Sequence, residues 1–244
     1  MGAAITDIGE HLPRTGHPDG GAGPRTALAA MGWISLVLVL DSDGSLWLQR
    51  LLGFATWAVL AAMLRQEVAL VRVQTGVVVV LATAVEYTFS PLLEVYTYRF
   101  DNVPAYVPPG HGVVYLAALA LGRSVWLRAH LRLVTAIVLV SGGTWALYGV
   151  TLAERSDALG MFWFLCLAGF LAWGPSRPLY VGAFVVVSYL EIVGTAVGTW
   201  QWQPVDPTGL VSIGNPPSGA AGGYGWFDLF ALLAGGRLLA WWRR

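Results

Sequence analysis

Residues 86–98, EYTFSPLLEVYTY, and residues 191–202, EIVGTAVGTWQW, decide the architecture of this chain because they are two versions of one pattern. Each stretch begins with a glutamate near the end of an apolar run and closes on two aromatic residues separated by one position. Each then returns to apolar sequence through a Pro-Pro motif, PPGHG at 108–112 and PPSG at 216–219. A pattern that recurs in this way predicts an internal duplication of the chain.

The composition is that of a polytopic membrane protein. Of the 244 residues, 56% are hydrophobic and 11% are charged, and the mean hydropathy is +0.63, which excludes an ordinary soluble domain. The formal net charge is zero, so the chain lacks the basic surface that nucleic-acid binding requires. The single cysteine excludes a disulfide within the chain.

Eight apolar segments are predicted to be helices. Every backbone group inside a bilayer must be hydrogen-bonded locally, and these runs are too long for the strands of a barrel. The segments are 26–40, 46–64, 74–92, 112–127, 131–150, 158–174, 179–198 and 223–241. We therefore expect an all-α integral membrane protein with about eight transmembrane helices.

The duplication predicts that these helices form two parallel repeats of four. The first repeat is expected over residues 26–127 and the second over residues 128–244. An even number of crossings in each repeat gives both repeats the same orientation in the membrane. Residues 1–25 are polar and lack the apolar core of a signal peptide, so they predict a disordered cytoplasmic tail.

The placement of arginine predicts the orientation. With the N-terminus inside, eleven arginines fall on the inner side, and the outer connections contain only Arg50, Arg99 and Arg155. Positive residues concentrate on the cytoplasmic side of bacterial membrane proteins. We therefore expect a multi-pass protein of the bacterial cell membrane with both termini in the cytoplasm and with loops 93–111 and 199–222 on the outside.

Glu86 and Glu191 are the strongest candidates for a functional site. Both are flanked by apolar residues, and an ionisable group at membrane depth is costly and is retained mainly where it has a function. If the repeats pack face to face, the two acids converge, and one is expected to keep its proton at neutral pH because two like charges repel in a low dielectric. A structural hydrogen bond between helices is the alternative role for each acid.

Further candidates lie near the two acids. Glu94 follows Glu86 by eight positions, so a helix that continued through Pro91 would place both carboxylates on one face. His111 is expected to relay protons to the acids, and Asp228 is expected to support them. The candidate substrate-binding residues are Tyr96, Tyr98, Trp200, Trp202, Asn215 and Tyr224.

Each of these candidates also has a structural interpretation. Tyr and Trp concentrate at membrane interfaces in any case, and Asn215 is a candidate helix cap. Glu94 fits a solvated loop, and His111 fits a hydrogen bond that only stabilises the fold. Carboxylates with His111 could hold a divalent metal, but no metal-ligand spacing is present, so no cofactor is expected.

The segment over 191–226, with its acid, its GTWQW sequence and its NPP motif, resembles the acid-plus-aromatic loops of membrane carotenoid hydratases. Those enzymes add water across an isoprenoid end-group double bond. The size and helical character are similar to small integral-membrane terpene cyclases, which use carboxylic acids to protonate a prenyl chain. The chain as a whole resembles uncharacterised actinobacterial multi-pass membrane proteins. The resemblances to the hydratases and to the cyclases each cover only a fraction of the chain, and PPGHG has no counterpart in the hydratase pattern.

Together the acids, the aromatics and the resemblance predict an intramembrane enzyme that acts on an apolar lipid. The expected reaction is acid-catalysed hydration or cyclisation of an isoprenoid double bond, of the lyase or isomerase type, as in carotenoid biosynthesis. Glu86 and Glu191 would form the acid/base pair. The alternatives are a non-catalytic carrier of a lipid, an ion or a proton, and an accessory subunit of an envelope-assembly complex.

Overall fold

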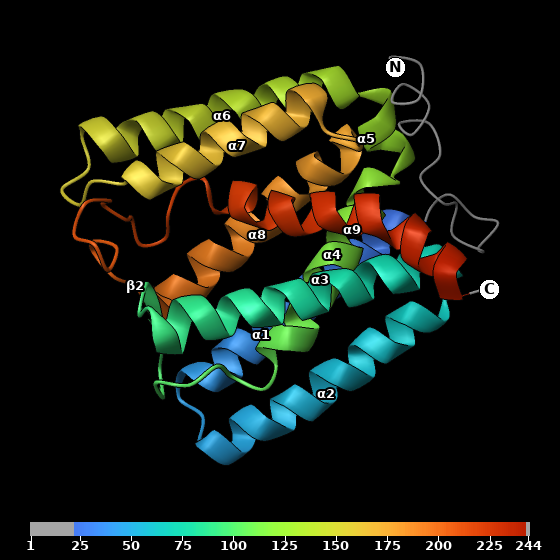
Figure 1. Ribbon diagram of the computed structural model, residues 1–244, viewed down its shortest axis with the longest axis horizontal. Helices are drawn as coiled ribbons and strands as arrows, with labels where there is room; N and C mark the ends of the chain where they lie inside the picture. Colours follow the sequence, from blue (N-terminus) through green and yellow to red (C-terminus); the bar gives the residue numbers. More distant parts are fainter. Residues whose placement is uncertain (1–21, 243–244) are drawn as a thin grey trace.

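The computed structural model describes residues 22–242, which form a bundle of helices with one small sheet (Figure 1). Residues 1–21 of the expected tail over 1–25 lie outside the described residues. Residues 22–25 belong to the first helix, so the apolar bundle begins before the predicted boundary.

The helices follow the predicted apolar segments. They are α1 (Ala22–Ser42), α2 (Leu46–Arg65), α3 (Ala69–Tyr87), α4 (Val107–Gly122), α5 (Val125–Ala129), α6 (Leu131–Thr151), α7 (Ala158–Trp173), α8 (Arg177–Ala196) and α9 (Ala220–Trp242). A π-helical turn, η1 (Thr88–Leu92), continues α3. Within residues 22–242, five helices are long and apolar enough to cross a membrane, namely α1, α2, α3 with η1, α6 and α8, and α4 and α7 are apolar but shorter.

The segment predicted at 112–127 differs most from the structure. Helix α4 begins at Val107 and takes Pro108 and Pro109 into its first turn, where a missing backbone N–H costs no hydrogen bond. The same helix ends at Gly122, and Ser124 then caps α5 by accepting a hydrogen bond from the backbone N–H of Leu127. The predicted span is therefore one buried helix followed by a short separate one.

Helix α4 is the centre of the bundle, and nearly all of its residues are buried. It packs most extensively against α8, and α3 packs in a similar way against α9. Glycines allow the α4–α8 backbones to approach closely, because a Cβ at Gly122 or Gly182 would collide with the carbonyl oxygen of Pro178 or Ala118. The main contacts of the bundle thus join helices from distant parts of the chain.

The sheet consists of β1 (Tyr96–Tyr98) and β2 (Trp200–Trp202), which pair in antiparallel fashion. Thr97 faces Gln201 at the centre of the ribbon. No local sequence pattern predicts this pairing. It brings the two motif loops together at one end of the bundle, where α3, α8 and their connections meet (Figure 1).

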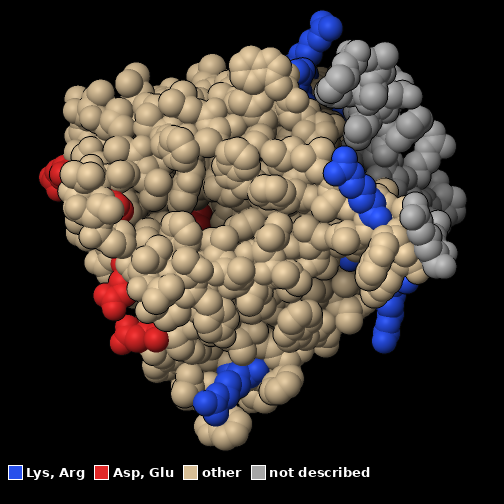
Figure 2. Space-filling view, in the orientation of Figure 1, with Lys and Arg blue, Asp and Glu red and all other residues tan. Residues whose placement is uncertain are grey.

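Charged residues gather at the two ends of the bundle. In Figure 2 most of the visible arginines lie at the right end of the molecule. The acidic residues along the outline of the molecule lie at the left end. Between these ends the helix sides are apolar, and large side chains such as Phe54 and Val140 are 75% and 69% exposed. An apolar surface of this kind suits contact with lipid and is unfavourable in water.

Candidate functional site

Glu86 lies one residue before the end of α3 and is 6% exposed. Its Oε2 accepts hydrogen bonds from the hydroxyl groups of Tyr96 at 2.9 Å and Tyr98 at 2.8 Å. Its Oε1 is hydrogen-bonded to Nε2 of His111 at 2.8 Å. Three polar partners therefore hold both oxygens of this buried carboxyl group.

The turn η1 explains how Tyr96 and Tyr98 reach back to this acid. Pro91 has no backbone N–H, and the chain leaves the α-helical path at Thr88. Glu94 then adopts a positive φ of 52° and is exposed. The helix passes Pro91 as a π-turn but ends at Leu92, so Glu94 lies beyond it and does not share a helical face with Glu86.

Glu191 occupies the matching place near the end of α8 and is 4% exposed. Its Oε2 accepts hydrogen bonds from the indole N–H groups of Trp200 and Trp202, each at 3.1 Å. Its Oε1 accepts no hydrogen bond from any residue within 22–242. Glu191 thus keeps one oxygen available, whereas both oxygens of Glu86 are occupied.

The two glutamates have a common local geometry. Each accepts two hydrogen bonds from the aromatic-x-aromatic pair that follows it, through phenols in one case and indoles in the other. The antiparallel register pairs Tyr96 with Trp202 and Tyr98 with Trp200. The donors to one acid therefore lie opposite the donors to the other.

Both glutamates line one cavity of about 280 Å³. Eleven of the lining side chains are Phe, Tyr or Trp. Of the candidate residues, the cavity brings together Glu86, Glu191, His111, Tyr96, Tyr98, Trp200, Trp202 and Tyr224. In Figure 2 this face of the molecule is hollowed near its centre, and an acidic side chain is visible inside the hollow.

Several aromatic residues of the cavity were absent from the predicted site. They come from α1, η1, α7 and α9, and they are Trp33, Phe89, Trp163, Trp226 and Phe227. In the sequence these residues sit within ordinary apolar runs. No local pattern distinguishes them from residues that only face lipid.

His111 separates this cavity from a second, much smaller one of about 10 Å³. Its ring stacks on Tyr224, with centroids 5.1 Å apart. Asp228 lies one turn further along α9 and lines the small cavity. Within the described residues, neither His111 Nδ1 nor Asp228 Oδ2 has a hydrogen-bond partner. The structure thus places Asp228 behind His111 and outside the main cavity.

Asn215 does not line either cavity. It is exposed, and its Oδ1 accepts a hydrogen bond from the backbone N–H of Trp202 at 3.1 Å. Helix α9 begins only at Ala220, so Asn215 is not its cap either. Asn215 therefore neither lines the cavity nor caps α9. Its hydrogen bond to Trp202 links β2 to the following loop.

Asp157 and Arg155 hold the same loop from the α6–α7 connection. The Asp157 carboxylate accepts hydrogen bonds from the backbone N–H groups of Gly160, Gly214 and Ser218. The Arg155 guanidinium donates to backbone carbonyls of β2 and the following loop, each at 2.6 Å. These contacts fix the strand that carries the two indoles.

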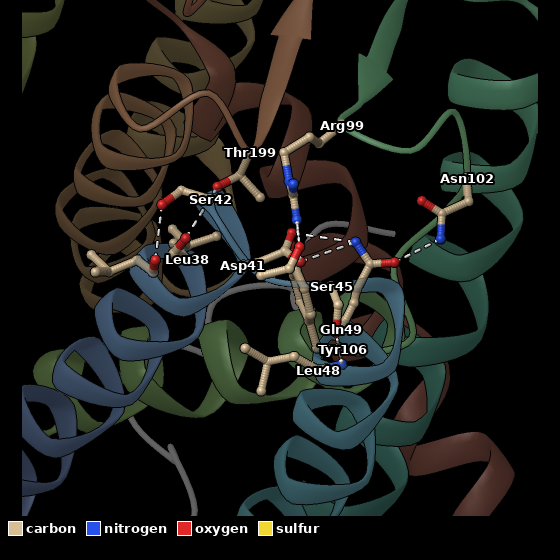
Figure 3. Close-up of polar contacts among 12 residues, drawn as sticks. Leu38, Asp41, Ser42, Ser45, Leu48, Gln49, Arg99, Asn102, Tyr106 and Thr199 are labelled. Carbon is tan, nitrogen blue, oxygen red and sulfur yellow. Dashed lines mark hydrogen bonds and ion pairs between the residues drawn. The ribbon is translucent and has the colours of Figure 1, made fainter.

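Asp41 has a comparable role at the end of α1 (Figure 3). It is fully buried and accepts hydrogen bonds from Tyr106 at 2.9 Å and from the side-chain amide of Gln49. Arg99 forms an ion pair with it at 3.9 Å. This cluster holds the connection between β1 and α4, from which Tyr106 reaches the cavity wall.

The phenol groups of Tyr96 and Tyr98 in β1 lose their protons only at a higher pH than an ordinary tyrosine does. Burial, followed by the nearby charge of Glu86, raises the pKa of both Tyr96 and Tyr98 well above 10.0. Both hydroxyl groups therefore remain protonated donors to Glu86 at neutral pH.

No protein-family model, curated protein or solved structure matches this chain. Within residues 22–242, no group of three or more His, Cys, Asp or Glu side chains is arranged to hold a metal ion. Function therefore has to be argued from the geometry of the site itself.

Proposed function

We propose that this protein is a membrane-embedded enzyme that protonates a double bond of an apolar lipid, with hydration or cyclisation of an isoprenoid chain as the reaction. The observation that carries this proposal is that two buried carboxyl groups line one aromatic cavity. A carboxylic acid can protonate an alkene, and aromatic π faces stabilise the resulting positive charge.

Glu191 is proposed as the acid, because it lines the cavity and its Oε1 has no hydrogen-bond partner among the described residues. The proton of its carboxyl group moves to one alkene carbon, and the π electrons form the new C–H bond. The other carbon becomes a cation and is attacked by the oxygen of a water molecule or by a second double bond. Loss of one proton then gives an alcohol or a cyclic alkene.

Glu86 with His111 is proposed as the base that accepts this last proton. Their contact of 2.8 Å allows a proton to be shared between carboxylate and imidazole. A proton taken up here must return to Glu191 to complete the cycle, and the shared cavity supplies the route.

The size of the cavity indicates how such a lipid would bind. Ligand cavities commonly span about 300 to 1,000 Å³, so one of about 280 Å³ suits the end of a chain. The remainder of the lipid would extend past the hollow of Figure 2 along the apolar helix sides.

The proposed setting is the bacterial cell membrane, with eight crossings in two parallel four-helix repeats and with both termini in the cytoplasm. The apolar helices, the matched glutamate geometries and the separation of arginines from acids support this arrangement. The loops that carry β1 and β2 would then lie at the outer face.

A proton or ion carrier is the second candidate. It is favoured by the continuation of the site from Glu86 through His111 to the cavity that Asp228 lines. Proton flux into proteoliposomes that disappears in Asp228→Asn, without turnover of any lipid, would support the carrier over the enzyme.

The enzyme proposal is tested with the full chain, expressed in a bacterial host that makes linear isoprenoids. Lipids extracted from cells grown in H₂¹⁸O are compared by mass spectrometry, and hydration adds one labelled water to the substrate mass. Growth in D₂O detects cyclisation through deuterium at the protonated carbon. Products should vanish in Glu191→Gln and Glu86→Gln but persist in Glu154→Gln, an exposed control. A lipid profile identical in all strains would reject the proposal.

A further inference from the structure

The main cavity combines two buried carboxyl groups with aromatic walls, and within residues 22–242 no basic side chain forms an ion pair or hydrogen bond with Glu191. Glu191 is buried, and its Oε1 has no partner within residues 22–242 although its Oε2 has two. None of the described residues that line the cavity is an arginine, and the chain contains no lysine. Once Glu191 has given up its proton, its carboxylate in such a place is complementary to a cation supplied from outside the protein.

The walls around Glu191 strengthen this preference. Trp200 and Trp202 direct their indole N–H groups to the carboxyl group, and both residues line the cavity. The ring of Tyr96 lies against Trp202 with centroids 4.5 Å apart, and Trp163 approaches Trp202 at 5.7 Å. Aromatic faces attract organic cations, and the attraction grows when water is excluded.

We propose that the cavity binds lipophilic organic monocations, with a tertiary or quaternary ammonium group beside Oε1 of Glu191 and an attached apolar chain toward lipid. The inference rests on the proposed function, because a cavity that stabilises a carbocation end also holds a permanent cation of the same shape. It adds that the natural substrate is one whose bound end carries or develops a single positive charge.

Other ligand classes fit the cavity less well. Two carboxylates disfavour an anion such as a phosphate or a fatty-acid headgroup. A divalent metal prefers several oxygen or nitrogen ligands, and no such group of three exists in the described part of the chain. A large, weakly hydrated ammonium ion needs only one carboxylate together with aromatic faces.

The test compares dodecyltrimethylammonium with 2,2-dimethyltetradecane, its uncharged isostere in which carbon replaces nitrogen. The full chain is reconstituted in nanodiscs of zwitterionic lipid, and binding is followed by quenching of tryptophan fluorescence. Empty nanodiscs correct for partition of each probe into the lipid. We expect the ammonium probe to bind at least tenfold more tightly than its isostere. Equal affinities in the unmodified protein would overturn the inference, whatever any variant does.

Two variants locate the charge. Glu191→Gln should abolish the preference for the cation while leaving binding of the uncharged isostere within about twofold. Glu154→Gln should keep the preference unchanged. A preference that persists in Glu191→Gln would overturn the assignment to Oε1. Cation binding without lipid turnover would reject only the proposed enzyme, and turnover without a cation preference would reject only this inference.

Discussion

Tyr96 and Trp202 lie opposite each other in the β1–β2 ribbon, with ring centroids 4.5 Å apart, and they donate hydrogen bonds to different glutamates. Strands of three residues are too short to be stable alone. The ribbon therefore depends on the buried acceptors beneath it, and each acid depends on the ribbon for its donors. A change at either ring is expected to affect both glutamates.

Trp202→Phe should lower the free energy of unfolding by about 1–3 kcal/mol, because buried Glu191 loses one of its two N–H donors. Unfolding by a graded denaturing detergent, followed by circular dichroism, measures this difference. Trp173→Phe is the matched control, since Trp173 is 86% exposed. Equal destabilisation by the two substitutions would mean that the hydrogen bond contributes nothing.

Alkaline pH should destabilise the protein through Tyr96 and Tyr98. Burial and Glu86 raise the pKa of both phenols, so the folded protein keeps protons that the unfolded chain releases above about pH 10. Their contribution to stability is complete below about pH 10 and is lost progressively as the pH rises further. Melting temperatures from pH 8 to pH 12 should fall less steeply in a Tyr96→Phe, Tyr98→Phe double variant. Parallel curves would contradict this explanation.

Gly182→Ala should destabilise the bundle by about 1–3 kcal/mol, because the added Cβ meets the Ala118 carbonyl where α8 crosses α4. Gly169 lies within α7, and a Cβ added to it would have no heavy atom within 4 Å. Gly169→Ala should therefore stabilise its helix by roughly 0.5–1 kcal/mol. The opposite signs, measured by the same unfolding titration, distinguish close packing from general helix propensity.

Glu94→Gln should leave lipid turnover within about twofold of the original protein, because Glu94 is exposed beyond η1. Glu86→Gln should lower turnover about 10²- to 10⁴-fold, the range associated with loss of an acid or base. Deuterium incorporation into lipid in D₂O measures both. Similar losses in the two variants would restore Glu94 to the site.

The sequence located the helices well because their apolar runs are long and are bounded by arginines, acids and prolines. Glu86, Glu191 and His111 were predicted from the sequence because they are polar groups among apolar neighbours, and all three line the main cavity. The β1–β2 pairing was missed, because it joins segments that no local pattern connects. The prediction that Glu94 shares a helical face with Glu86 failed for a local reason. The chain forms a π-turn around Pro91, and the helix ends at Leu92, before Glu94.

The packing of α4 on α8 has a consequence for biosynthesis. Translation of residues 123–196, which completes α8, takes roughly 4 to 15 seconds at about 5–20 residues per second. Over that interval the side of α4 that contains Gly122 lacks its partner α8. Final assembly of the site must therefore wait for the C-terminal helices to leave the ribosome, and a chain that stalled after α6 would carry Glu86 without Glu191 or its indole donors.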